Sequence, residues 1–252
     1  MKPKVLISIS SSKDLNLKAD GYILGYQKYT SFAAGYFSFE EIKEISKNKN
    51  IYLLLNSLID EDSLEDFKKE FNRLVKLDIN FIVQDMGALA FLSSLISKER
   101  IIFEPYTLIC SRSDLITYKD IFGVGVMIAN NLKEQEKIEL INNESAGILV
   151  FGHYPIYQSY RKLLSLYQDY KNVNYAKETP YFLREDTRND YYPIIENEHG
   201  SFIFSHDIVD LSNHLKQLFN AEYWILEKNF VDEESFLKAL DAANLVKEAE
   251  DE

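Results

Sequence analysis

Short apolar runs alternate along the chain with longer segments in which apolar positions recur every three or four residues. Most of the short runs are continuously apolar, as expected for parallel strands that are buried on both faces of a sheet. Eight strands are predicted, at residues 4–10, 21–25, 51–56, 79–84, 100–104, 123–128, 147–151 and 222–227. Strands that alternate with helices predict an α/β fold, here a TIM-like (β/α)8 barrel.

Helices are predicted in the intervals between these strands. Ser38 and Glu41 have the spacing of a capping box, in which each side chain satisfies an unpaired amide of the other residue. Ser63 opens a segment with apolar residues on one face and Glu and Lys opposite. Further helices are predicted at residues 86–98, 131–142, 208–219 and 233–246, whereas the interval between residues 10 and 21 has room for one helical turn.

The long interval before the last strand departs from this alternation. Three short apolar segments, 181–184, 192–196 and 201–205, are separated by polar turns at 185–190 and 197–200. This pattern predicts antiparallel strands. We therefore expect one barrel domain over residues 1–252, with a β-rich, hairpin-like insertion at residues 178–207.

Composition and charge limit the kinds of function that this chain can have. Hydrophobic residues make up 46% of the 252 positions, enough for one large core. The formal net charge of −12 argues against a stand-alone nucleic-acid binder, because affinity for phosphate depends on clustered Lys and Arg. A basic partner or a local positive patch would reverse that expectation.

Cysteine usage and the N-terminus add further limits. A single cysteine, Cys110, excludes an internal disulfide and any metal or cluster site built from several cysteines of this chain. The apolar run before Cys110 favours a buried side chain over a reactive thiol. The first residues are too weakly apolar for a signal peptide, and no segment is long enough to span a membrane, so we expect a cytoplasmic protein.

Common catalytic motifs are absent from the sequence. It contains no Gly-rich dinucleotide or phosphate loop, no His-Glu-x-x-His zinc motif and no Gly-x-Ser-x-Gly nucleophile elbow. No metal site is therefore predicted in this chain.

In a (β/α)8 barrel the active site lies at the carboxyl ends of the strands. His153 is prominent because an apolar strand leads directly to it, as a general base or a proton shuttle requires. The alternative is a histidine that is hydrogen-bonded beneath a loop. The polar residues at the predicted strand exits are Ser10, Ser11, Gln27, Asn56, Asp85, Glu104, Asn130, His153 and Glu227.

Polar residues also follow His153 and occupy the insertion. Gln158, Ser159 and Arg161 come shortly after it, and the planar guanidinium of Arg161 suits a carboxylate or a phosphate. The alternative for Arg161 is a solvated position on a helix face. Glu198 and His199 precede a glycine at a turn, where an acid and an imidazole can shape a site.

Two segments resemble the peptidase U32 family, the collagenase-like proteases. The first contains His153, Gln158, Ser159 and Arg161 and continues through the run 163–170. The second contains Phe-Leu-Arg-Glu at 182–185, Tyr-Pro-Ile at 192–194 and Glu-His-Gly-Ser-Phe-Ile-Phe-Ser at 198–205. The segments around residues 38–45, Asn56 and 85–92 fit the early part of the family's barrel more weakly.

The resemblance implies functions beyond proteolysis. The family includes tRNA-hydroxylation proteins, which add a hydroxyl to the wobble uridine and depend on prephenate, and quinone-hydroxylation proteins. Larger members carry cysteines that bind an iron–sulfur cluster. Because this chain lacks them, it resembles a short member that acts with a longer, cysteine-bearing relative, and only that partner could hold the cluster.

Three functions follow from the resemblance as alternatives: a tRNA-hydroxylation subunit, a U32-type peptidase, and a non-catalytic scaffold for the longer relative. For the first, His153 and Glu198 are the expected catalytic residues, and tRNA is expected to bind through the partner. Prephenate or a similar carboxylate is the expected ligand of Arg161. The expected substrate-binding residues are Asn56, Asp85, Gln158, Ser159, Arg161 and His199.

Overall fold

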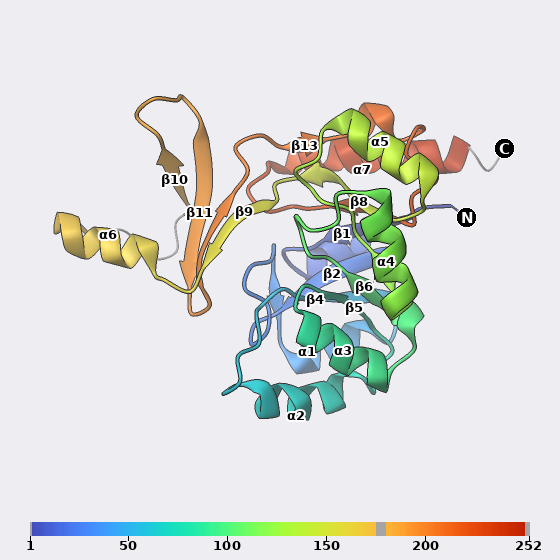
Figure 1. Cartoon of the computed structure of the whole chain (residues 1–252), viewed down its shortest axis with the longest axis horizontal. Helices are drawn as coiled ribbons and strands as arrows, with labels where there is room; N and C mark the ends of the chain where they lie inside the picture. Colours follow the sequence, from blue (N-terminus) through green and yellow to red (C-terminus); the bar gives the residue numbers. More distant parts are fainter. Residues whose placement is uncertain (1, 175–179, 250–252) are drawn as a thin grey trace. The chain divides into compact units, whose positions relative to one another are not determined.

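The computed structural model describes residues 2–174 and 180–249, which form two compact units (Figure 1). The first unit consists of Met1–Gly152 and Val209–Glu252, and the second of His153–Ile208. The second unit therefore begins earlier than the expected insertion, whose predicted start at residue 178 lies outside the described residues.

The first unit is built on a curled, mostly parallel sheet of ten strands. All eight predicted strands are present, in the spatial order β8-β14-β1-β2-β4-β5-β6-β7. The strands β7 and β8, at the two ends of this series, are joined by a single parallel bridge between Met127 and Gly147. The eight strands are β1 (Lys4–Ser8), β2 (Gly21–Tyr26), β4 (Ile51–Leu55), β5 (Asn80–Val83), β6 (Ile101–Phe103), β7 (Gly125–Val126), β8 (Gly147–Gly152) and β14 (Tyr223–Leu226).

Two short strands extend this sheet. The strand β3 (Tyr36–Phe37) pairs with β2, and β13 (Val209–Asp210) runs antiparallel to β8. The α/β class is thus confirmed, and the strands β7 and β8 are not joined by a continuous ladder.

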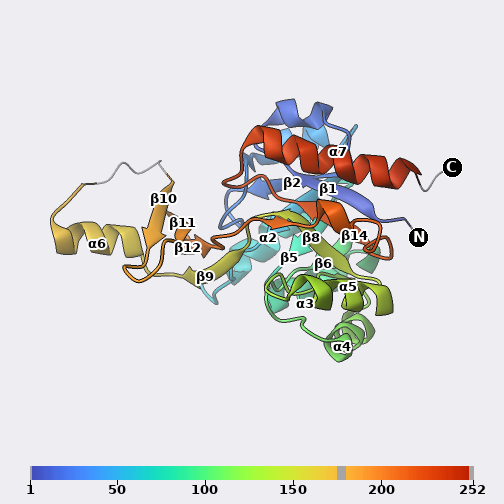
Figure 2. The same cartoon turned by 90° about the horizontal axis from the view of Figure 1, so that it is seen from above.

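Helices lie outside the curled sheet of the first unit (Figures 1 and 2). The capping box of Ser38 and Glu41 is confirmed. The Ser38 hydroxyl accepts a hydrogen bond from the Glu41 amide, and the Glu41 carboxylate accepts one from the Ser38 amide. The helices are α1 (Phe39–Ile45), α2 (Leu64–Leu74), α3 (Met86–Leu95), α4 (Arg112–Phe122), α5 (Glu134–Asn143) and α7 (Glu233–Ala249), with 3₁₀ turns η1 (Ser12–Asn16), η2 (Lys98–Arg100) and η3 (Ser212–His214).

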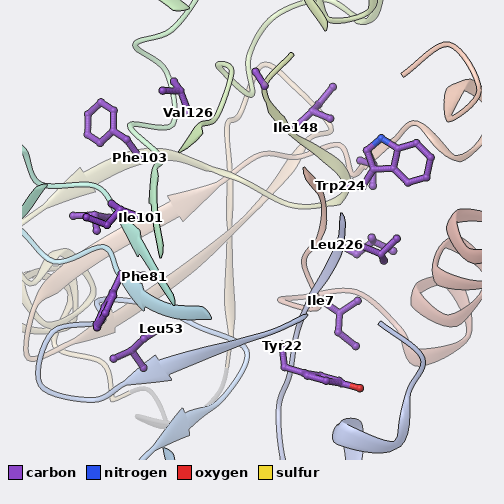
Figure 3. Close-up of a cluster of buried hydrophobic side chains, with 14 of the residues drawn as sticks. Ile7, Tyr22, Leu53, Phe81, Ile101, Phe103, Val126, Ile148, Trp224 and Leu226 are labelled. Atoms are coloured by element: carbon purple, nitrogen blue, oxygen red, sulfur yellow. The ribbon is translucent and has the colours of Figure 1, made fainter. Parts of the chain in front are cut away.

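Alternate residues of the strands face these helices and form the core. Figure 3 shows side chains from successive strands pointing away from the middle of the curled sheet, among them Ile7, Leu53, Phe103 and Trp224. These side chains are at most 1% exposed. Because side chains alternate along a strand, the residues next to them face inward.

The predicted helix at residues 208–219 is wrong. This segment forms β13, the 3₁₀ turn η3 and further turns. The amide of Leu211 donates to the carbonyl of Val150 at 2.8 Å, which holds the chain against β8. Pairing with the sheet thus overrides the apolar spacing that suggested a helix.

In its described residues, the second unit is a four-stranded antiparallel sheet with one helix, α6 (Leu163–Lys171). The three strands predicted in the insertion are present, and β9, which the sequence pattern did not reveal, pairs with β12. The strand order is β10 (Tyr181–Arg184), β11 (Tyr191–Asn197), β12 (Gly200–Phe204) and β9 (Pro155–Ser159).

The helix α6 is anchored to this sheet through its first turn. The carboxylate of Glu196 accepts hydrogen bonds from the backbone amides of Leu164 (2.8 Å) and Ser165 (3.3 Å). The hydroxyl of Ser201 accepts the amide of Leu163 at 2.9 Å. A negative charge and an acceptor at a helix N-terminus satisfy amides that have no partner within the helix.

Within the described ranges, no helix combines the length and the apolar character that crossing a bilayer would require.

Candidate functional site

A layer of polar side chains faces inward at the carboxyl end of the parallel sheet in the first unit. Leu226, Phe103 and Ile7 point outward (Figure 3), so the residues that follow them, Glu227, Glu104 and Ser8, face inward. Glu104 continues the ladder of β6, since its amide donates to the carbonyl of Val83 at 2.9 Å. The sheet thus directs two carboxyl groups from different strands into its interior.

Both carboxyl groups have raised pKa values. Burial, reinforced by the charge of Glu227, raises the pKa of Glu104 from 4.5 to about 8. Burial also raises the pKa of Glu227, to about 7, although hydrogen bonds from Ser8 and Asn229 oppose this rise. The hydroxyl of Ser8 also accepts the backbone amide of Lys228 at 2.7 Å, which fixes the hydroxyl beside Glu227. Near neutral pH, Glu104 retains its proton and Glu227 is partly ionised.

Asn56 joins two loops beside this acid pair. Its Oδ1 accepts the amide of Ser31 at 2.8 Å, and its Nδ2 donates to the carbonyl of Phe32 at 3.0 Å and to Oη of Tyr106 at 3.2 Å. Asn56 is fully buried, and its amide is used to hold these loops in place. The sequence placed Asn56 correctly at a strand exit, and a contact with substrate remains a prediction.

Tyr106 belongs to the same site. Burial and the charge of Glu104 raise the pKa of its hydroxyl well above the ordinary value, despite the hydrogen bond from Asn56. Its backbone has a positive φ of 53°, a conformation that non-glycine residues seldom adopt outside turns and functional sites. Its carbonyl accepts the amide of Asn130 at 2.8 Å, which ties the loop after β6 to the loop after β7.

Asp85 also follows a strand of this sheet, and its carboxylate caps a helix. Oδ1 accepts the amide of Ala88 at 2.7 Å, at the start of α3. This contact explains why an acid stands at the position, and a role in substrate binding remains a prediction.

The remaining expected site residues lie in the second unit. His153 is 7% exposed, and its Nδ1 lies 2.8 Å from the carbonyl oxygen of Ser205. This contact places the proton of a neutral ring on Nδ1, and burial lowers the pKa of the imidazole. His153 is therefore neutral near pH 7 and is held beneath the end of β12.

The structure does not bring His153 and Glu198 together. His153 and Ser205 lie at one end of the antiparallel β9–β12 pair, and the turn with Glu198 and His199 lies at the other. Five residues of β12 separate the two ends, about 15 Å of strand. A joint acid–base role for this pair is therefore not supported by their positions.

At the Glu198 end, other expected residues do meet. His199 Nε2 lies 4.0 Å from the Glu198 carboxylate, and the Ser159 hydroxyl accepts the amide of Arg161 at 3.1 Å. Gly200 has a φ of 123°, and a Cβ there would lie 2.0 Å from the carbonyl oxygen of Ser159. Ser159 and the turn are thus in close contact, while Gln158 is half-buried on β9 and Arg161 is exposed.

The expected burial of Cys110 is wrong, because the residue is exposed on the loop before α4. Partial desolvation of the sulfur atom and the charges of Asp114 and Glu136 raise the pKa of the thiol, which disfavours the reactive thiolate. In residues 2–174 and 180–249, no group of three or more His, Cys, Asp or Glu side chains is arranged to hold a metal ion.

The acid pair of the first unit is the arrangement with the clearest chemical capacity. A carboxylic acid that keeps its proton can donate a hydrogen bond or a proton, and an ionised neighbour can accept one. Glu104 and Glu227 were visible in the sequence as strand exits, but neither was singled out. The missed signal was that two exits of one parallel sheet both carry glutamates, which the strands bring close enough for their charges to interact.

Comparison with known proteins identifies the family. The model of peptidase family U32 matches residues 12–240. A Bacillus subtilis (strain 168) protein named tRNA hydroxylation protein P2 is 23% identical over 256 aligned positions, covering 87% of this chain and 77% of that protein. A crystal structure of the C-terminal domain of a candidate chitinase from Desulfitobacterium hafniense DCB-2 aligns with a TM-score of 0.45 at 10% identity, covering 98% of this chain and 99% of that one. Since the family model spans most of its length, the chain belongs to peptidase family U32.

Proposed function

We propose that this protein is a component of tRNA wobble-uridine 5-hydroxylation and acts with a longer, cysteine-bearing relative. The match to a protein named for tRNA hydroxylation carries the proposal. That match covers 87% of this chain and 77% of the other protein, so the likeness extends far beyond a single motif.

The cysteine content supports the need for a partner. Iron–sulfur clusters are held mainly by several cysteine thiolates. This chain has one cysteine, with a pKa raised above its ordinary value. A cluster used in this reaction would therefore be bound by the partner.

In this proposal the buried acids hold the reacting ligand at the carboxyl end of the sheet. The protonated carboxyl of Glu104 donates a hydrogen bond, and Glu227 accepts a proton or a hydrogen bond. Two acids at one place disfavour an anionic ligand. Prephenate or a similar carboxylate is therefore assigned to Arg161 of the second unit, as the sequence suggested.

The proposal includes a closed (β/α)8 barrel in a cytoplasmic protein. Closure would join β7 to β8, and the bridge between Met127 and Gly147 supports this pairing. The amide of Ile128 also donates to the carbonyl of Gly147 at 3.0 Å.

Loss of the gene tests the function. Nucleoside mass spectrometry of tRNA from the source cell should show loss of 5-hydroxyuridine derivatives, and a plasmid copy should restore them. An unchanged profile, in a strain without a redundant relative, would end this proposal.

A U32-type peptidase is the second candidate, favoured by the family's description and by one contact. Ser205 Oγ lies 3.4 Å from His153 Nδ1, although the nearer carbonyl of Ser205 engages the same nitrogen. Cleavage of casein or denatured collagen that is lost in Ser205→Ala would support it. A scaffold without catalytic activity would instead tolerate Glu104→Gln and Arg161→Ala without loss of tRNA hydroxylation.

A further inference from the structure

Exposed tyrosines and basic side chains gather on the second unit, where β9 ends and α6 follows. Tyr160 is 64% exposed, Tyr167 48% and Tyr170 79%. Arg161, Lys162 and Lys171 are exposed between and beside them. These six residues are called the tyrosine–basic surface below.

The tyrosines of α6 are not part of a core. A surface helix of a globular protein usually buries an apolar stripe, but α6 has no buried residue. Its first turn is attached to the sheet by polar contacts with Glu196 and Ser201. The side chains of Tyr167 and Tyr170 therefore lie largely at the surface of the unit.

The charge of this segment runs against the charge of the chain. Residues 156–173 contain three basic residues and a single acid, Asp169, whereas the chain as a whole has a net charge of −12. The ammonium group of Lys171 lies 5.2 Å from the centre of the Tyr170 ring, so aromatic and positive groups adjoin. The neighbouring turn carries Glu198, which faces His199 at 4.0 Å.

We propose that the tyrosine–basic surface binds single-stranded RNA. Proteins bind unpaired RNA by stacking bases on aromatic rings and by placing Lys and Arg near the phosphates. The surface offers both groups, and its positive charge complements a polyanion. The inference rests on the proposed function in one respect: the natural ligand would be an unpaired loop of tRNA.

The test uses the full chain and two labelled RNAs, a hairpin with an unpaired loop and a blunt duplex of equal length. The wild type should bind the hairpin more tightly. Tyr160→Ala/Tyr170→Ala should weaken hairpin binding about tenfold or more, because two bases would lose the aromatic rings on which they stack. Tyr160→Phe/Tyr170→Phe should bind like the wild type, because phenylalanine retains the stacking face.

The salt dependence of binding distinguishes the contribution of the basic side chains from that of stacking on the tyrosines. Lys162→Ala/Lys171→Ala should reduce the slope of log affinity against log salt by about 1.4, or about 0.7 for each phosphate contact with a single strand. Two variants serve as matched controls and should leave binding unchanged. Tyr191→Ala removes a 49%-exposed ring on the sheet face away from Glu196 and Ser201, which hold α6, and Lys69→Ala removes an exposed cation of the first unit.

Equal affinity for hairpin and duplex, or unchanged binding by Tyr160→Ala/Tyr170→Ala, would overturn the inference. Unchanged RNA binding together with lost association with the longer relative would identify a protein interface and also overturn it. Loss of RNA binding in these variants, with no change in tRNA nucleosides on gene deletion, would support the RNA surface and refute the proposed function. The two failures are thus distinguishable.

Discussion

The two units of the chain place their reactive groups differently. In the first unit, Glu104 and Glu227 point into the interior of the curled parallel sheet. Burial there raises their pKa values to about 8 and about 7. The second unit exposes aromatic rings, and more than half of the chain's tyrosines, nine of 17, lie within residues 153–208. A buried pair of acids suits proton transfer or a small ligand, whereas exposed rings suit a large partner.

The comparison also shows why net charge is a poor guide to local chemistry. The second unit has six basic and eight acidic residues, so its net charge is −2, and the first unit accounts for the other −10. The chain-wide value of −12 argued against RNA binding, yet the segment at 156–173 is positive. Charge therefore has to be assessed segment by segment.

The largest expected effect is a loss of stability in the second unit alone. Gly200→Ala would force a Cβ against the Ser159 carbonyl at a φ of 123°, and should destabilise the second unit by at least about 2 kcal/mol. Limited proteolysis should then cleave within residues 153–208. The single tryptophan, Trp224, is buried in the first unit, so its fluorescence should keep the wild-type emission. A shift in that emission would contradict separate folding of the units.

The next largest effect is a pH-dependent change in stability caused by the two buried acids of the first unit. Both acids have raised pKa values, so the folded chain binds more protons than the unfolded chain between about pH 4.5 and about pH 8. Their contribution to stability is present below that range and is lost as the pH rises through about 7 and about 8. The melting temperature should fall by roughly 5–10 °C between about pH 5 and about pH 9.

The variants Glu104→Gln and Glu227→Gln should each flatten this pH profile, because the amide cannot ionise. Glu40→Gln, at an exposed position of α1, should leave the profile unchanged. A wild-type melting temperature that is independent of pH over this range would show that the pair is solvated rather than buried.

A smaller effect concerns the anchor of α6. Glu196→Ala removes the acceptor for the amides of Leu164 and Ser165 and should destabilise the first turn by about 1 kcal/mol. Hydrogen exchange should accelerate at these two amides and stay unchanged in α2. Equal protection in both proteins would mean that other contacts hold the helix.

The smallest expected effect concerns the charge beside the tyrosine–basic surface. Glu198→Gln removes an exposed negative charge from the turn that contacts Ser159 and Tyr160, and should tighten hairpin binding about twofold at low salt. The gain should disappear at high salt, where exposed charges are screened. A gain that is independent of salt would show that Glu198 acts through structure rather than charge.

Much of the fold could be predicted from sequence because its signals are local. Continuous apolar runs located all eight parallel strands, and the Ser38–Glu41 box located a helix start. The helix α4 was missed because Leu115 is its only buried residue, which leaves little apolar periodicity. Its ends were nevertheless marked, by a Ser111–Asp114 capping box and by Gly123 with a φ of 66°.

The site was harder to predict because it depends on contacts between distant segments. The sequence placed Asn56 at a strand exit, but could not show that its side-chain amide forms hydrogen bonds with Ser31, Phe32 and Tyr106. Nor could it show that Glu104 and Glu227, 123 positions apart in the sequence, lie close enough for their charges to interact. Conversely, His153 and Glu198 suggested a pair in sequence, yet β12 holds them at opposite ends.

The central claim is that buried acids in one unit and exposed tyrosines in the other both serve tRNA hydroxylation. Its most direct test is nucleoside mass spectrometry of tRNA from gene-deleted cells that express the wild type, Glu104→Gln, Tyr160→Ala/Tyr170→Ala or Tyr191→Ala at equal levels. The account predicts that 5-hydroxyuridine derivatives return with the wild type and Tyr191→Ala, and stay low with the other two. Full restoration by Glu104→Gln and by the tyrosine pair variant would contradict it.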